Sequence, residues 1–272
     1  MVFRVGLYKL LQILVFVAFT FFPFFVKAQT TLPVSSKYLF SNDTSLVFLP
    51  SNIHSDTYYP AVILLHGYGG NAYQWVRIAD LQAAADKFSM IIVSLDAKKD
   101  SWYIESQKAG YRFESFFIKE FFPKFVSLFP VDTTKVFITG FSMGGHGAIH
   151  MLLTFPDLFA GAGSMSGVLD LRSSSVTKSI EALIGKNIKT NSAWDSLSVI
   201  NHVEDLKKIN KPLIVDCGSE DYFCKINVDF YNKCIERGCK VVFSTTSGNH
   251  NPDYWKRMLP NHLMYFRQFA NK

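Results

Sequence analysis

The chain is 272 residues long and carries 28 basic side chains, 22 acidic side chains and four cysteines. This length is sufficient for one large α/β domain with a substantial core. Three of the basic residues fall in the first 28 positions, which contain no acidic residue. The remaining excess of positive charge is too small to predict nucleic-acid binding.

Residues 1–28 have the pattern of a secretory signal peptide. A basic start precedes an apolar run over 10–26, and a small-residue cleavage pattern ends at Ala28. An uncleaved membrane anchor is the rival interpretation, because the run is about as long as the shortest spanning helix. Pro23 and the cleavage pattern favour removal. We therefore expect a secreted or periplasmic protein made of residues 29–272, without stable membrane insertion.

Short apolar runs alternate with amphipathic stretches along this mature chain. The runs predict strands that are buried on both faces, at 61–65, 90–95, 135–139, 213–216 and 240–244. The amphipathic stretches predict helices at 75–88, 114–129, 143–155, 225–237 and 253–270. This alternation is typical of an α/β fold with a mostly parallel central sheet and helices on both of its faces.

Two other segments complete the predicted architecture. Residues 36–50 are expected to add edge strands before the parallel run, and the polar segment 170–206 is interpreted as an irregular insertion over one end of the sheet. A lid or substrate-binding element usually occupies that place. Ligands bind at the carboxyl ends of the strands in such sheets, so the residues after each strand are the functional candidates.

The strand at 135–139 is followed by a Gly-x-Ser-x-Gly sequence centred on Ser142. A serine at this boundary must occupy a sharp turn, and side chains at the flanking glycines would collide with the neighbouring strand and helix. The N-terminus of the next helix offers free N–H groups where an oxyanion would form. Ser142 is therefore the candidate nucleophile.

A glycine-rich loop, His66-Gly67-Tyr68-Gly69-Gly70, follows the strand at 61–65. A tetrahedral intermediate needs two N–H donors, one of them from the residue after the nucleophile and the other from an earlier strand end. We expect the backbone N–H groups of Met143 and Tyr68 to fill these roles. The side chain of His66 either contacts substrate or, as we favour, holds the loop by hydrogen bonds.

A catalytic serine also needs a base and a carboxylate. In a fold of this kind they follow the serine along the chain, first the acid and then the histidine. His250 lies beyond the last predicted strand and two residues after Gly248, so it is the candidate base. His146 and His150 on the nucleophile helix, and His262 in the middle of the last helix, are interpreted as packing or surface residues.

Three carboxylates follow the strand at 213–216 closely enough to be the acid: Asp216, Glu220 and Asp221. Asp221 is favoured because it lies deeper in the loop, where its side chain can reach an imidazole. The four cysteines allow three disulfide pairings, and they are either small buried thiols or local bridges. Because no histidine cluster accompanies them, we expect no metal site. A serine, an acid and a histidine that act together require no other cofactor.

Together these motifs resemble the esterase D-like group of α/β-hydrolases. This group includes tributyrin-type esterases, the feruloyl and acetyl-xylan esterases of carbohydrate esterase family 1, S-formylglutathione hydrolases and mycolyltransferases. The resemblance covers nearly the whole mature chain, and its segments are Leu64–Gly70 with Trp75, Ser101–Tyr103, Tyr111–Phe116, Gly140–Ala148, Gly163–Gly167, Cys217-Gly218 with Asp221, and His250 with Trp255. The chain departs from the group at His146 and in Gly-Asn-His-Asn-Pro around the base.

The resemblance implies an α/β-hydrolase fold and a serine esterase that uses Ser142, Asp221 and His250. Export argues against a cytosolic glutathione thioester and favours a short-chain acyl or polysaccharide-linked acetyl or feruloyl ester. Trp102 and Tyr103 either stack on sugar or phenolic rings of the substrate or belong to the core. An acyltransferase with a sugar hydroxyl as acceptor, and a non-catalytic carbohydrate-binding protein, are the alternatives.

Overall fold

The computed structural model describes residues 29–173, 177–185 and 192–271. The signal peptide predicted at 1–28 lies outside the described residues. The described part of the chain contains no helix long and apolar enough to cross a membrane.

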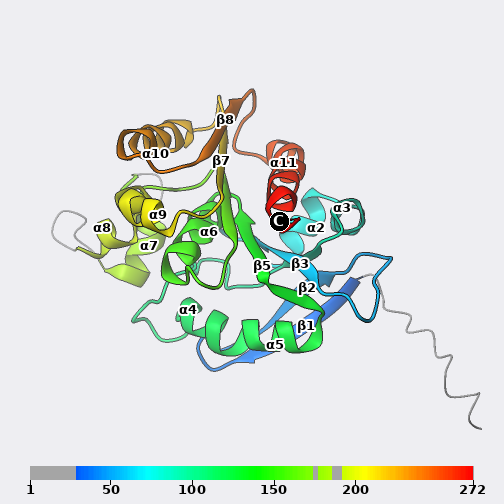
Figure 1. Cartoon of the computed structure of the whole chain (residues 1–272). Coiled ribbons are helices and arrows are strands. Elements are labelled where there is room, and N and C mark those ends of the chain that lie inside the picture. The colour runs from blue at the N-terminus through cyan, green and yellow to red at the C-terminus, as the bar shows by residue number, and fades with distance from the viewer. Residues whose placement is uncertain (1–28, 174–176, 186–191, 272) are drawn as a thin grey trace, which may run out of the picture.

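A single eight-stranded sheet runs through the described residues in the order β1-β2-β4-β3-β5-β6-β7-β8 (Figure 1). The first two strands are antiparallel to their neighbours, and all the others are parallel. The strands are β1 (Gln29–Ser36), β2 (Ser41–Phe48), β3 (Tyr59–Leu65), β4 (Ile91–Ser94), β5 (Val131–Gly140), β6 (Gly161–Met165), β7 (Leu213–Gly218) and β8 (Val242–Thr246). The mostly parallel α/β-hydrolase sheet predicted from the sequence is confirmed.

Helices cover both faces of this sheet (Figure 1). One face carries α2 (Tyr73–Ile78), α3 (Leu81–Phe88) and α11 (Pro252–Ala270). The other face carries α4 (Phe113–Phe116), a π-helical turn (Phe117–Phe121), α5 (Phe122–Leu128), α6 (Met143–Thr154), α9 (Val203–Ile209) and α10 (Cys224–Arg237). Alternate residues of β3 enter the two cores, Val62 and Leu64 on the first face and Ile63 on the second.

The helix predicted at 75–88 is two helices in the structure. Ala79 is extended, with φ −142° and ψ 154°, and therefore ends α2. The side chain of Asp80 then caps α3 by accepting a hydrogen bond from the N–H of Ala83 at 2.9 Å. The helix predicted at 114–129 is also interrupted, because its middle turn is π-helical.

Three further expectations need correction. β1 begins at Gln29, well before the edge strands predicted from residue 36. β6 was not among the predicted strands, because its sequence Gly-Ala-Gly-Ser-Met contains no β-branched residue. The segment 170–206 is largely helical where it is described, with α7 (Thr177–Ile184), α8 (Ala193–Leu197) and a 3₁₀ turn (Val199–His202) before α9.

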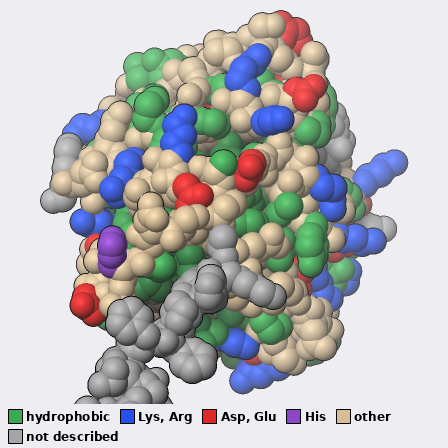
Figure 2. Space-filling view, turned by 90° about the vertical axis from the view of Figure 1, so that its right-hand side faces the viewer, with side chains coloured by type: hydrophobic (Ala, Val, Ile, Leu, Met, Phe, Trp, Pro, Cys, Tyr) green, Lys and Arg blue, Asp and Glu red, His purple; other side chains and the backbone are tan. Residues whose placement is uncertain are grey.

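The surface carries mixed charge on the face that Figure 2 shows, where lysine and arginine side chains lie among acidic and hydrophobic ones. All four cysteines are free thiols: Cys217, Cys224, Cys234 and Cys239. Three of them are buried, so the prediction of small buried thiols describes them better than local disulfides.

Candidate active site

The nucleophile candidate occupies a strained turn between β5 and α6. Ser142 has φ 56° and ψ −119°, a conformation that residues with a side chain rarely adopt. A Cβ atom at Gly140 would lie 2.6 Å from the carbonyl oxygen of Gly144. One at Gly144 would overlap the backbone carbonyls of Leu65 and His66. Both flanking glycines are therefore required by the close approach of β3 to the turn.

The three residues proposed as a triad lie in one hydrogen-bonded chain. The Nε2 atom of His250 is 2.9 Å from the hydroxyl oxygen of Ser142, and its Nδ1 atom is 2.8 Å from Oδ2 of Asp221. With Nδ1 protonated, the imidazole donates to Asp221 and accepts from the serine hydroxyl. This arrangement can remove the proton of Ser142 during attack on a carbonyl carbon.

The carboxylate of Asp221 is held in its charged form. Its side chain is fully buried, which alone would raise its pKa. Hydrogen bonds from His250 and from the backbone N–H of Phe223 at 2.8 Å outweigh burial, so the pKa of Asp221 is lowered. A permanent negative charge beside Nδ1 can stabilise an imidazolium.

Two buried aromatic rings pack against the imidazole of His250. Trp255 on α11 presents its ring edge-on at 5.1 Å between centroids, and Phe223 does so at 5.2 Å. The exposed ring of Tyr222 is a neighbour of the imidazole at 4.6 Å between centroids, inclined by 43°. Trp255 also stacks on Phe141 of the turn at 4.0 Å, so the base and the nucleophile share one packed support.

The loops that carry the acid and the base are joined directly. The N–H of Glu220 donates to the carbonyl oxygen of Gly248 at 3.0 Å, and the N–H of Gly248 donates to the carboxylate of Glu220. This second bond, the largest influence, lowers the pKa of Glu220. The sequence indicated Glu220 only as a rival acid, whereas in the structure its carboxylate holds the backbone of Gly248, two residues before His250.

Two backbone N–H groups are free to receive an oxyanion. No described residue provides a hydrogen-bond acceptor for the N–H of Tyr68 or of Met143, whereas the N–H groups of Gly67, Gly69 and Gly70 all have acceptors. Met143 begins α6, so its N–H lies at the positive end of that helix. They are the same two N–H groups that the sequence indicates as candidate oxyanion donors.

Of the two roles considered for His66, Trp102 and Tyr103, burial favours the structural role. His66 and Tyr103 have no exposed surface, and Trp102 is 1 % exposed. The Nε2–H of His66 donates to the carbonyl oxygen of Ala97 at 2.7 Å, and the hydroxyl of Tyr103 donates to that of His66 at 2.8 Å. His66 and Tyr103 therefore support the glycine-rich loop at 66–70, the oxyanion loop, by hydrogen bonds, and Trp102 lies in the core.

The rival acid Asp216 has a different partner. It is completely buried, and its Oδ2 accepts a 2.6 Å hydrogen bond from Nε2 of His262 on α11. The other ring nitrogen of His262 accepts from the hydroxyl of Thr139 at 2.8 Å. Asp216 is therefore paired with His262, and His262 is a buried structural residue and not a surface residue.

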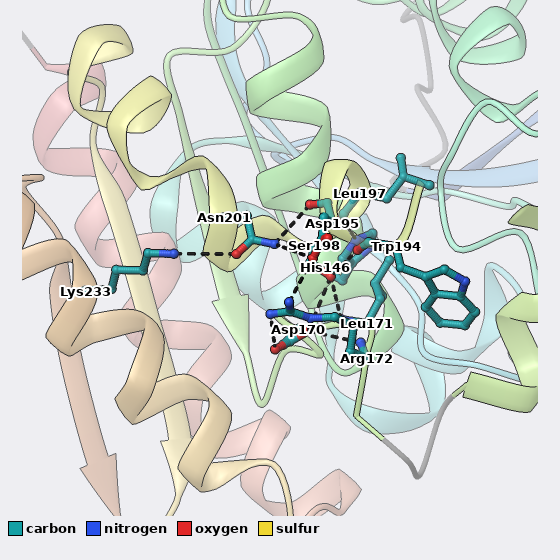
Figure 3. Close-up of polar contacts among 10 residues, drawn as sticks. All are labelled: His146, Asp170, Leu171, Arg172, Trp194, Asp195, Leu197, Ser198, Asn201 and Lys233. Atoms are coloured by element: carbon teal, nitrogen blue, oxygen red, sulfur yellow. Dashed lines mark hydrogen bonds and ion pairs between the residues drawn. The ribbon is translucent and has the colours of Figure 1, made fainter. Parts of the chain in front are cut away.

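The segment interpreted as a lid is tied to the nucleophile helix. The Nε2–H of His146 on α6 donates to the carbonyl oxygen of Leu197 at the end of α8, at 2.9 Å (Figure 3). Within the segment, Arg172 pairs with Asp170 at 2.9 Å and with Asp195 at 2.8 Å. These contacts bring residues 170–172 and α8 together beside α6 and close to the nucleophile turn.

The fold and the loops at its strand ends define an α/β-hydrolase. The chain belongs to the Esterase family, whose model matches residues 36–266. It is 26% identical over 255 residues to an acetyl esterase of Caldicellulosiruptor saccharolyticus, with 83% of this chain and 93% of the relative covered. It is 23% identical over 253 residues to an S-formylglutathione hydrolase of Mus musculus, with 83% and 88% covered.

A solved structure of a ferulic acid esterase has the same fold, with a TM-score of 0.77 and 26% identity. The alignment covers 88% of this chain and 97% of that structure. These findings confirm the resemblance to the esterase D-like α/β-hydrolases. The protein is a carboxylic ester hydrolase.

Proposed function

We propose that this hydrolase is a secreted serine esterase that cleaves short-chain acyl esters or acetyl or feruloyl esters of carbohydrates. The single observation that carries the proposal is the hydrogen-bonded chain Ser142–His250–Asp221, with distances of 2.9 and 2.8 Å. The hydroxyl of Ser142 lies at the end of this chain, and the backbone N–H groups of Tyr68 and Met143 are free to hold the oxyanion. Together these groups supply what acyl transfer from an ester requires.

In the proposed reaction, His250 takes the proton of Ser142 while the serine oxygen attacks the ester carbonyl carbon. The N–H groups of Met143 and Tyr68 stabilise the oxyanion, and Asp221 stabilises the imidazolium. His250 then gives the proton to the leaving alcohol. Water attacks the acyl-enzyme with His250 again acting as the base, and the acid is released. Apart from the ester and water, the proposed reaction uses only side chains and backbone groups of this chain.

The substrate class is supported by the relatives and by the cell compartment that the sequence implies. Two of the relatives are named for acetyl and ferulic acid esters. Cleavage after Ala28 would release a protein outside the cytosol, away from a glutathione thioester. Intact mass and N-terminal sequencing of the secreted protein test this location, and a mature chain that begins at Gln29 is the expected result.

The catalytic proposal is tested with p-nitrophenyl acetate and the variant Ser142→Ala. Loss of the nucleophile should lower kcat about a million-fold, as in other serine hydrolases. Ser127→Ala on α5 is the matched control and should retain full activity, because Ser127 is exposed and its hydroxyl donates only to the nearby carbonyl oxygen of Lys124. Equal rates for wild type and Ser142→Ala would exclude Ser142 as the nucleophile.

Product analysis separates hydrolysis from transfer to a sugar hydroxyl. With xylose added as acceptor, the proposed esterase should release acetate in the same amount as p-nitrophenol. Acetylated xylose as the main product would instead identify an acyltransferase. A protein that binds xylose but releases neither product would be a carbohydrate-binding protein on a hydrolase scaffold.

A further inference from the structure

An exposed aromatic ring lies directly against the candidate base. Tyr222 follows Asp221 in the chain and is 66 % exposed. Its ring centroid is 4.6 Å from that of His250 and 4.5 Å from that of the buried Phe223. One side of the ring therefore rests on the site, while much of the side chain is open to solvent.

The chemistry determines which part of a substrate passes this ring. His250 must donate its proton to the leaving oxygen, so that oxygen comes within about 3 Å of Nε2. The alcohol part of the ester extends from that oxygen. The carbonyl oxygen is instead held at the N–H groups of Tyr68 and Met143. Because Tyr222 packs against the imidazole, it borders the path of the alcohol.

The surroundings of Tyr222 suit a sugar. The face of an aromatic ring packs against the C–H face of a pyranose or furanose, and amide and carboxylate groups bind its hydroxyls. Ser219, Glu220 and Asn249 are exposed polar residues of the two loops that meet here. The hydrogen bond from Gly248 lowers the pKa of Glu220, so this edge of the site keeps a negative charge that disfavours anionic alcohols and thiols.

We propose that Tyr222 is the platform for a sugar ring on the alcohol side of the ester, and that it makes the enzyme prefer carbohydrate esters to esters of small alcohols. This inference rests on the proposed esterase function. It assigns Tyr222 a role in substrate specificity, separate from the positioning of His250 by Trp255 and Phe223.

Two acetyl esters that differ only in their alcohol test the inference. Methyl 2-O-acetyl-β-xyloside and ethyl acetate form the same acetyl-enzyme, so deacylation is common to both. Tyr222→Ala should raise KM for the acetylated xyloside about tenfold, which is the loss expected for one aromatic contact. The kcat/KM for ethyl acetate should stay within about twofold of wild type. Tyr222→Phe keeps the ring and should behave as wild type on both esters.

The matched control is Tyr58→Ala, which removes a tyrosine that is 72 % exposed and precedes the amino end of β3. Tyr58→Ala should change neither KM for the acetylated xyloside nor kcat/KM for ethyl acetate. An equal loss on both esters in Tyr222→Ala would show that Tyr222 acts through His250, and no loss on either would show that it has no role; both outcomes overturn the inference. If the wild-type protein hydrolyses neither ester, the proposed function itself is refuted, and this outcome is seen before any Tyr222 variant is measured.

Discussion

At the scale of single residues, two aspartates near the end of β7 differ in their hydrogen-bond partners. Asp221 accepts a hydrogen bond from His250, whereas Asp216 accepts one from His262. We predict that Asp221→Asn lowers kcat for p-nitrophenyl acetate about 10⁴-fold, because the amide cannot hold the same imidazole tautomer or stabilise its charge. Steady-state rates at saturating substrate measure this change.

Asp216→Asn is the matched control for that prediction. It makes the same chemical change five residues away, at a carboxylate with no contact to His250, and should keep kcat within about tenfold of wild type when the protein is folded. Circular dichroism at the assay temperature confirms folding. The reverse order of the two losses would assign the acid to Asp216 and contradict the geometry.

The three residues of the proposed triad could be picked out from the sequence because each follows a strand end, and Ser142 and His250 also lie near glycines. Ser142 is flanked by glycines, and His250 follows one closely. The burial of the aromatic substrate-binding candidates could not be predicted, because it depends on the path of the loop that carries them. Trp102 and Tyr103 both have positive φ angles, 53° and 61°, and this turn directs their side chains into the core.

At the scale of elements, the turn between β5 and α6 leaves no room for a methyl group. We predict that Gly144→Ala lowers kcat/KM about 100-fold or more. The added Cβ would overlap two backbone carbonyls, so β3 and the oxyanion loop must move, and shifts of about 1 Å cost this much in rate. Rates normalised to the fraction of sites labelled by a fluorophosphonate measure the effect. An unchanged rate would mean that the oxyanion loop does not depend on this contact.

The contact between α6 and α8 should make stability sensitive to acid. Burial, with a smaller effect of His150, lowers the pKa of His146 to about 3. In the unfolded chain the pKa of this histidine is about 6.5. Below that pH the unfolded state binds a proton at His146 and the folded state does not, so stability falls as pH falls. We predict that His146→Gln, which can still donate to Leu197, removes about 2–3 kcal/mol of the stability lost between pH 7 and pH 4.5.

Urea unfolding of both proteins at the two pH values measures this difference. His202→Gln is the control, because His202 lies at the surface beside Asp205 and should change the pH dependence little. Equal losses of stability in wild type and His146→Gln would show that His146 is not the acid-sensitive group.

Elements with strong periodicity were predicted well, and elements that depend on tertiary contacts were not. The glycines of β6 gave no strand signal, yet they are needed there because a Cβ at Gly161 would lie 2.7 Å from the carbonyl oxygen of Pro212. The break at Ala79 has a local cause, the capping side chain of Asp80, which the periodicity of the apolar residues conceals.

At the scale of the whole molecule, the sequence predicted the layers because buried parallel strands need apolar residues on both sides. The two cores follow that rule, with β3 and β5 contributing to each. The sequence did not predict how the layers are joined by polar groups. The pairing of Asp216 with His262 connects residues 46 positions apart, and neither residue has a local motif that indicates its partner.

This buried connection should contribute to global stability. His262 is hydrogen-bonded to Asp216 on β7 at 2.6 Å and to Thr139 on β5 at 2.8 Å, with both the imidazole and the carboxylate fully buried. We predict that His262→Ala lowers the free energy of unfolding by about 3–5 kcal/mol, because it leaves the Asp216 carboxylate buried without its partner. Urea unfolding measures the change, and kcat of the folded fraction should stay near wild type.

The double variant His262→Ala/Asp216→Ala provides the decisive comparison. If the stranded carboxylate causes the loss, removing it as well should recover part of the stability, and the double variant should be more stable than His262→Ala alone. Additive losses in the two single variants would contradict this. Additivity would mean that the stability comes from packing of the imidazole against β5 and β7. The polar connection between these strands and α11 would then contribute little.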